Sequence, residues 1–376
     1  MRILNVNATI DPVNGGGTAE RTFQLSRFFA KQGAECALLT LDLGITEERL
    51  EKLTAVSVTA LRCVMERYYI FPLPEPRIDE LVAWADVVHM SGHWTLLNAA
   101  VYRSAHRLGK PHVSCPAGAL PLYGRSGALK ALYNWVVGRK IIRDARACIA
   151  IADNEIAQFM DYGVPVEKIT LIPNGIDPDE FASPDSSGFR VKFGLPDAPL
   201  ILFMGRLNSI KGPDLLLQAF ARSEPVNRHY HLVFAGPDGG MLKQLREMAD
   251  RAGVEKHVHF IGHVGTRDKL GAYCASDLLV IPSRQEAMSI VVLEAGMCDC
   301  PVLITDRCGF AEVERIGGGR VVSPSVDGLR SGLLEMLSGV TSLHAMGKKH
   351  GEFVRQNFLW DFACKRYLEV FSRLRH

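Results

Sequence analysis

The sequence lacks the features typical of membrane-spanning, nucleic-acid-binding and disordered proteins. No apolar run is long enough to cross a bilayer, and we expect no signal peptide ahead of the first strand. The net charge is only +2, so no strong electrostatic field favours nucleic acid as a partner. No internal repeat is present, and a composition of 47% hydrophobic and 22% charged residues is that of a globular protein. A chain of 376 residues is natural for two domains.

Nine cysteines are present, but their spacing fits neither a metal site nor a disulfide-rich domain. Cys36, Cys148 and Cys274 lie inside apolar runs, and Cys298 and Cys300 form only a C-x-C pair. We therefore expect reduced, mostly buried thiols, no metal, and a cytoplasmic location.

The second half of the chain alternates strands with helices in short steps. Apolar runs predict strands at residues 200–204, 232–235, 258–261, 278–281, 302–305 and 320–323. This alternation predicts a parallel sheet that is covered by helices on both faces.

Two glutamates follow the strand predicted at 278–281. Glu286 lies in a polar turn, and Glu294 lies eight positions later in an apolar helix that begins near Ser289. The helical neighbours three and four positions from Glu294 are all apolar: Ile290, Val291, Met297 and Cys298. A carboxylate on such a face must accept hydrogen bonds. A ribose diol could supply them, and so could a neighbouring arginine or backbone N–H.

Two cations lie between the strand at 200–204 and a helix that Pro213 is predicted to begin. Arg206 and Lys211 both lie near the positive end of that helix, where cations are unfavourable unless an anion joins them. A diphosphate held by these cations, with a sugar hydroxyl near Glu286, would explain the pattern. Solvated loop cations are the alternative.

The segments GRLNSIKG (205–212) and EAMSIVVLEAGMCDCPV (286–302) resemble the donor-binding half of the retaining glycosyltransferases of family 4. The resemblance is strong over 200–314 and weaker before it. It implies the α/β fold called GT-B, in which two Rossmann-like domains face each other across a cleft. We expect an acceptor-binding domain at 1–176, a nucleotide-sugar donor-binding domain at 177–357, and a helix at 358–376 that crosses back to the first domain. The sequence departs from the family at Met288-Ser289, usually Phe-Gly, and at Asp299, usually Gly.

The resemblance also implies roles for individual residues. It assigns catalysis to Arg206, Lys211, Glu286 and, on the acceptor side, His93. It assigns donor binding to Gly16, Gly17, Gly236, Val264, Met288, Ser289, Ile290 and Glu294. The glycine turn at 14–17 is by itself a weak signal, because a plain tight turn explains it equally well.

The first half has predicted strands at 2–6, 36–40, 86–90, 148–152 and 169–172, a strand followed by a loop within 111–120, and a loop at 68–76. His89 lies within an apolar strand, so a core role is favoured, whereas His93 lies in the following loop. The family commonly has His or Arg where this chain has Ala117. We expect His93, rather than His112, to substitute for the missing side chain.

A helix predicted at 129–146 has both apolar and basic faces. Its basic residues are Lys130, Arg139, Lys140, Arg143 and Arg146. A packed helix with a charged outer face is the favoured interpretation. The alternative is that this helix attaches the protein peripherally to the inner face of a membrane.

These observations predict transfer of a sugar from a nucleoside diphosphate sugar, with UDP or GDP as the nucleotide, to a glycan or a lipid-linked glycan. Retention of configuration is implied by the family alone. A sugar-nucleotide epimerase and a binding protein without catalysis are the alternatives, and incubation with the donor alone would separate them. A dehydrogenase is disfavoured, because neither glycine turn has the G-x-G-x-x-G spacing. No cofactor is expected.

Overall fold

The chain folds into two compact units. A computed structural model describes residues 1–122, 126–182, 186–338 and 342–374. The first unit comprises Met1–Gly175 and Trp360–His376, and the second comprises Ile176–Leu359. These bounds differ slightly from those expected, because Phe358 stays with the second unit, where its carbonyl accepts from the Ile176 N–H at 2.7 Å.

The sheet of the first unit has seven parallel strands in the order β3-β2-β1-β4-β5-β6-β7. They are β1 (Arg2–Val6), β2 (Glu35–Leu41), β3 (Val56–Leu61), β4 (Val87–Ser91), β5 (His112–Cys115), β6 (Ala147–Ala150) and β7 (Ile169–Leu171). Six of these strands were predicted and β3, at the edge, was not. Its side chains are mostly half-exposed, so it lacks the continuous apolar run of a central parallel strand.

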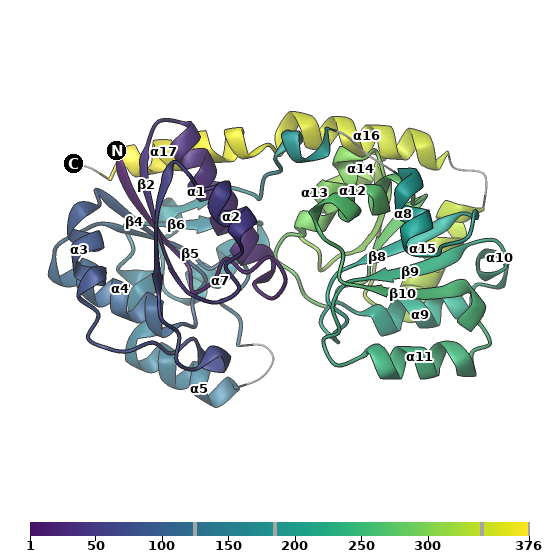
Figure 1. Ribbon diagram of the computed structural model, residues 1–376, viewed down its shortest axis with the longest axis horizontal. Helices are drawn as coiled ribbons and strands as arrows, with labels where there is room; N and C mark the ends of the chain where they lie inside the picture. The colour runs from purple at the N-terminus through teal and green to yellow at the C-terminus, as the bar shows by residue number, and fades with distance from the viewer. Residues whose placement is uncertain (123–125, 183–185, 339–341, 375–376) are drawn as a thin grey trace. The chain divides into compact units, whose positions relative to one another are not determined.

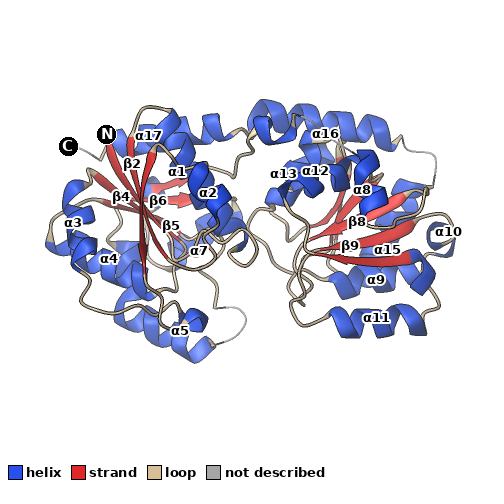
Figure 2. Cartoon of the chain, viewed as in Figure 1, coloured by secondary structure: helices blue, strands red, loops and turns tan. Residues whose placement is uncertain are grey.

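Helices cover both faces of this sheet (Figures 1 and 2). They are α1 (Gly16–Lys31), α2 (Glu47–Glu51), α3 (Pro76–Trp84), α4 (Leu96–Arg107), α5 (Gly127–Tyr133), the π-helix η2 (Asn134–Gly138), α6 (Arg139–Arg143), α7 (Asn154–Asp161) and α17 (Trp360–Ser372). The helix predicted at 129–146 is therefore the continuous segment α5–η2–α6. It ends at Arg143, and Arg146 lies outside it. Two 3₁₀ turns, η1 (Glu66–Tyr68) and η3 (Val166–Lys168), complete the unit.

The C-terminal helix α17 packs on α1, although the two are separated by most of the sequence. The Phe29 and Tyr367 rings meet edge to face, with centroids 5.8 Å apart. Arg21, fully buried, donates to the Tyr367 hydroxyl at 2.6 Å and to the Ile172 carbonyl at 3.0 Å. The predicted return of the C-terminal helix to the first domain is thus confirmed.

The second unit has a six-stranded parallel sheet in the order β10-β9-β8-β11-β12-β13. Its strands are β8 (Leu200–Met204), β9 (His231–Ala235), β10 (Val258–Gly262), β11 (Leu278–Ile281), β12 (Val302–Thr305) and β13 (Gly319–Val322). Its helices are α8 (Ser186–Lys192), α9 (Pro213–Ala221), α10 (Glu224–Asn227), α11 (Leu242–Arg251), α12 (Thr266–Cys274), α13 (Ile290–Met297), α14 (Glu312–Arg315), α15 (Val326–Leu337) and α16 (Leu343–Asn357), with 3₁₀ turns η4 (Pro178–Phe181) and η5 (Glu255–His257). In Figure 2, α13 and α16 lie on one side of the sheet and α9 and α11 on the other.

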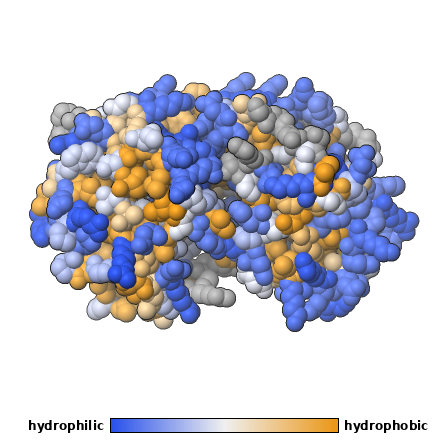
Figure 3. Space-filling model, viewed as in Figure 1, coloured by the Kyte–Doolittle hydropathy of each residue, from blue (hydrophilic) through white to orange (hydrophobic). Residues whose placement is uncertain are grey.

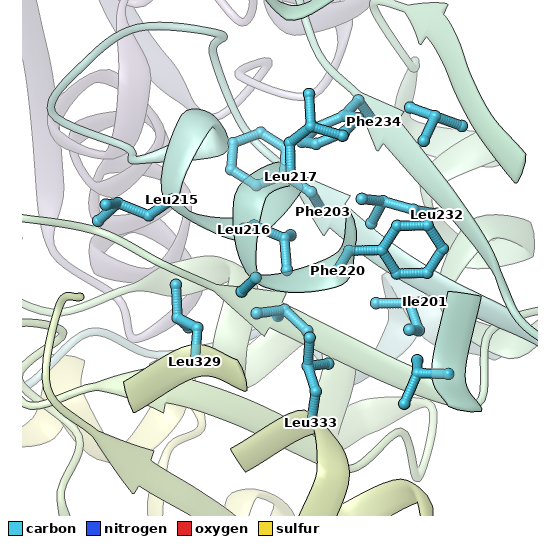
Figure 4. Packing of buried hydrophobic residues seen from close by; sticks show 14 of the residues in the cluster. Ile201, Phe203, Leu215, Leu216, Leu217, Phe220, Leu232, Phe234, Leu329 and Leu333 are labelled. Carbon is cyan, nitrogen blue, oxygen red and sulfur yellow. The ribbon is translucent and has the colours of Figure 1, made fainter. Parts of the chain in front are cut away.

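A large apolar core holds the second unit together. Phe203 and Phe234, from the neighbouring strands β8 and β9, pack with Phe220 of α9 (Figure 4). Leu329 and Leu333 of α15 join the same cluster. This packing fixes the direction of the strands, and therefore the position of the loops that follow them. Among the described residues, no helix is long and apolar enough to cross a membrane.

Candidate functional site

The candidate site in the second unit lies where β8, β9 and β11 end. Glycines allow the loops after these strands to meet backbone to backbone. A Cβ atom on Gly236 would lie 2.0 Å from the Gly205 carbonyl oxygen, and one on Gly212 would lie 2.1 Å from that of Pro282. Both glycines also have positive φ, of 147° and 68° respectively, so a side chain is excluded by space and by conformation. The polar residues on these loops are therefore brought to one edge of the sheet.

Lys211 and Glu286 meet at this edge. The Lys211 ammonium lies 2.7 Å from one carboxylate oxygen of Glu286, and the Ser283 hydroxyl donates to the other at 3.0 Å. The Glu286 N–H donates to the Arg307 carbonyl at 3.0 Å, which fixes the turn. The two residues that the sequence assigned to phosphate and to sugar thus form an ion pair. Glu286 partly relieves the local excess of positive charge noted in the sequence.

Arg284 is a structural support that sequence reasoning missed. Its guanidinium makes a bidentate contact with the Asp214 carboxylate, at 2.9 and 2.6 Å, and donates to the Ser209 carbonyl at 2.6 Å. Asp214 lies in the first turn of α9, so this contact ties the Lys211 loop to the Glu286 turn. The two segments are far apart in sequence, and no local pattern pairs them.

Arg206 lies two residues after the end of β8 and is partly buried beside the 236–240 turn. The Cγ atom of Arg206 would lie 2.9 Å from a Cβ atom on Gly239, so the turn passes close to the side chain. Asp238 holds this turn by accepting from the N–H groups of Gly240 and Leu242 at 2.7 and 3.1 Å. These backbone hydrogen bonds lower the pKa of the exposed Asp238 carboxyl below its usual value, and the bond from Leu242 has the largest effect.

The N-terminus of α13 contains three residues assigned to the donor: Met288, Ser289 and Ile290. Ser289 is the N-cap residue, as the predicted helix start near Ser289 requires. Its N–H donates to the Cys308 carbonyl at 3.3 Å. Met288 and Ser289 are buried and Ile290 is partly exposed. A phosphate at this helix would therefore meet N–H groups beyond Ser289 first.

Glu294 is satisfied within the protein. The Lys269 ammonium lies 2.7 Å from one carboxylate oxygen, and the hydroxyl of the buried Tyr273 donates to the other. Burial, together with the charge of Glu294, raises the pKa of Tyr273 well above its usual value. The sequence left two kinds of partner open for Glu294, a ribose diol or a neighbouring protein group. The structure shows protein partners, but they are a lysine and a tyrosine of α12 rather than an arginine or a backbone N–H. A carboxylate has about four acceptor positions, so acceptor capacity remains on Glu294 for further donors.

Val264 follows the end of β10 and is buried. At that end the Gly262 carbonyl accepts from the Gly236 N–H at 2.6 Å. The donor-binding position at Val264 is thus next to the glycine turn after β9.

In the first unit, Gly16 and Gly17 occupy the first turn of α1. The turn before them is closed by Asp11, whose carboxylate accepts from the N–H groups of Val13 and Asn14 at 2.7 and 3.1 Å. A Cβ atom on Gly16 would meet nothing within 4 Å. The space beside Gly16 is therefore open.

His93 is buried, with 1% of its surface exposed. Its Nε2 lies 3.0 Å from the Asn134 side-chain oxygen, and the rings of Trp94, Tyr133 and Tyr162 surround it. Burial lowers the pKa of His93 to about 4, so the imidazole is neutral at physiological pH. Its visible role is to hold η2 against the unit. His89 is a core histidine, as the sequence favoured.

The loop after β5 has an unusual backbone at Ala117. This residue has φ 49°, in the left-handed region, and it is partly exposed. The buried Glu155 holds the loop, because one of its carboxylate oxygens accepts from the Gly118 N–H and the other from the Ile151 N–H, at 2.6 Å. Burial raises the pKa of Glu155 despite these bonds.

Comparisons with known proteins agree with this architecture. Residues 15–180 match the family model described as Glycosyltransferase Family 4, and residues 187–352 match that described as Glycosyl transferases group 1. The D-inositol 3-phosphate glycosyltransferase of Jonesia denitrificans is 28% identical over 313 residues, which cover 78% of this chain and 72% of that protein. That of Stackebrandtia nassauensis is 29% identical over 232 residues, which cover 58% of this chain and 52% of that protein. The chain thus spans about half the length of the Stackebrandtia relative.

The structure of HepE from Anabaena superimposes with a TM-score of 0.82 at 19% identity, covering 99% of this chain and 100% of that one. Two Rossmann-like units of this kind, joined by a returning C-terminal helix, define the GT-B class of glycosyltransferases. One family model matches the first half of the chain and the other matches the second half. The protein belongs to the family 4 type of glycosyltransferases.

Proposed function

We propose that this protein transfers a sugar from a nucleoside diphosphate sugar to a hydroxyl of a glycan or lipid-linked glycan, with retention of configuration at the anomeric carbon. The observation that carries the proposal is the Lys211–Glu286 ion pair on the loops that follow β8 and β11, with Arg206 after β8 and Glu294 in the helix after β11. Ligands of open α/β sheets bind at the carboxyl ends of the strands. The Anabaena HepE structure was determined in complex with UDP-glucose, which favours UDP over GDP as the nucleotide here.

Binding of the donor rearranges the ion pair at the strand ends. The diphosphate takes the ammonium of Lys211 as a partner, and Arg206 supplies a second cation. Glu286, released from Lys211 but still bonded to Ser283, then accepts from sugar hydroxyls. The ribose hydroxyls donate to the Glu294 carboxylate, while Val264 lines the nucleobase position.

The chemical step needs charge stabilisation at the leaving diphosphate. The bond between the anomeric carbon and the diphosphate oxygen breaks, and a bond from the acceptor oxygen to the same carbon forms. The acceptor proton passes to the leaving diphosphate oxygen. Arg206, Lys211 and the N–H groups at the start of α13 stabilise the negative charge that develops there. We propose that these groups act without a metal ion.

The first unit supplies the acceptor site in this proposal. The Ala117 loop follows the carboxyl end of β5, and the turn at Gly16 and Gly17, which is assigned to donor binding, follows β1. Because His93 is buried, we assign it a positioning role behind the loop rather than contact with the acceptor.

A nucleotide panel followed by product analysis tests the proposal. UDP, GDP and ADP are compared by thermal shift, since a nucleotide at 100 times its Kd stabilises the folded state by about 2.7 kcal/mol. UDP-sugars are then incubated with and without a glycan or polyprenyl-linked acceptor. Acceptor-dependent release of UDP is expected. Conversion of the sugar without an acceptor would indicate an epimerase, and binding without turnover of any donor would indicate a protein that has lost catalysis.

A further inference from the structure

The segment α5–η2–α6 presents an apolar face to solvent. The large apolar side chains exposed on it are Leu129, Leu132, Trp135 and Val136. Trp135 is 81% exposed. Positions 129, 132 and 136 are separated by three and four residues, which places them on one helical face. In the view of Figure 3, hydrophobic residues reach the surface in the part of the first unit where Figure 1 places α4 and α5.

This face is not the one by which the segment packs on the unit. The Tyr133 hydroxyl donates to the Thr95 carbonyl at 3.0 Å, and the Asn134 amide donates to the Tyr162 hydroxyl at 2.7 Å. Ile141 and Ile142 are buried. The segment therefore has an inner face that is already satisfied, and its exposed apolar residues form a second, outward face.

Positive charge continues along the outward face. Arg139, Lys140 and Arg143 are exposed. The Arg139 guanidinium also lies over the Tyr162 ring, 5.6 Å from its centroid, so this cation borders the inner face. The sequence contains no Asp or Glu from Leu122 to Arg143. Within the described ranges, no carboxylate forms an ion pair with any of these three cations. The packed-helix interpretation favoured from the sequence thus holds only for the inner face.

We propose that the outward face of α5–η2–α6 docks on an anionic lipid bilayer. A tryptophan and leucines beside a row of cations suit the boundary between headgroups and acyl chains. The cations face lipid phosphates while the apolar side chains leave water. A second copy of the chain is a poorer occupant, because in a two-fold dimer the same positively charged patch would meet itself. This proposal goes beyond sugar transfer and does not require it.

Vesicle binding by the whole protein tests the proposal directly. Co-sedimentation is measured with phosphatidylcholine vesicles that contain about 30% phosphatidylglycerol, and with pure phosphatidylcholine vesicles, at low and high salt. Tryptophan fluorescence is recorded in parallel. We expect binding to the anionic vesicles only, weaker at high salt, with a blue shift that disappears in Trp135→Phe.

Two charge variants separate this surface from charge in general. The triple variant Arg139→Gln, Lys140→Gln, Arg143→Gln should bind anionic vesicles at least tenfold more weakly. The matched control neutralises three exposed cations of α11 in the other unit, Lys243→Gln, Arg246→Gln and Arg251→Gln, and should change binding less than twofold. Circular dichroism and thermal midpoints confirm that each variant folds.

Four results would overturn the proposal: no binding to anionic vesicles at low salt, equal binding to neutral vesicles, an equal loss in the α11 control, or a dimer in sedimentation velocity that Trp135→Ser dissociates. The last result would assign the face to a second copy of the chain. Because none of these measurements uses a sugar donor, they can fail while the transferase proposal stands, and the reverse also holds.

Discussion

Replacing Glu294 by Gln distinguishes a ligand-binding carboxylate from a purely structural one. The substitution keeps the shape of the side chain and removes its charge. Hydrogen bonds to a charged group contribute about 1.5–3 kcal/mol, against about 0.5–1.5 kcal/mol for neutral ones. Losing the charge should therefore weaken the bond from the buried Tyr273 hydroxyl by about 1 kcal/mol. The Lys269 contact adds less, because that ammonium is 35% exposed and screened by solvent.

The same loss of charge should weaken nucleotide binding if the ribose donates to this carboxylate. We expect the Kd for UDP, measured by calorimetry, to rise roughly tenfold, which corresponds to about 1.4 kcal/mol. Tyr273→Phe is the matched control, because it removes one protein partner and leaves the Glu294 charge in place. It should lower the unfolding free energy in urea but change the Kd less than about threefold. Equal UDP affinity in wild type and Glu294→Gln would refute the ribose assignment.

Three further outcomes follow from the structure. Lys211→Ala should lower kcat/KM for the donor more than tenfold, or about 1.4 kcal/mol, because the diphosphate loses a cation. The surface control Lys192→Ala should not lower it. Equal losses in both variants would contradict a specific role for Lys211 in binding the diphosphate. Ala117→Gly should raise the unfolding free energy by about 0.5–1 kcal/mol by relieving a left-handed backbone, and a loss of stability would contradict this. Burial lowers the pKa of His89 to about 3 and of His93 to about 4, below the usual 6.5, so the unfolded chain takes up protons first. Stability should be full above about pH 6.5 and fall as the pH decreases to 5, by roughly 2 kcal/mol for each histidine in urea denaturation; a flat profile would contradict this.

The strands were predictable to the extent that they are buried on both faces. The strands Leu200–Met204, Leu278–Ile281 and Val302–Thr305 have the bounds that their apolar runs predict. The edge strand Val56–Leu61 was missed, because its alternating, half-exposed side chains do not form such a run. The π-helix Asn134–Gly138 was also beyond prediction, since it preserves an apparently continuous helical pattern.

The candidate site shows the same division. Arg206, Lys211, Glu286 and Glu294 lie in local segments whose spacing is visible in the sequence. The partners of these residues are not visible in the sequence. Contacts such as that of Lys269 with Glu294 join separate helices that only the folded sheet brings together. Burial was the other quantity that sequence could not supply. In the structure His93 is buried, although it was expected at the acceptor site. Trp135 is exposed, although its helix was expected to pack on the unit.

The first unit is built from both ends of the chain, and this determines the order in which the protein can be completed. Residues 1–175 leave the ribosome first, yet Arg21 and Phe29 have no Tyr367 to contact until the last segment has been synthesised. The second unit is contiguous in sequence and can close before that. During synthesis, the half that begins first therefore finishes last. A premature stop after residue 359 would leave the second unit whole and uncover the α1 surface of the first.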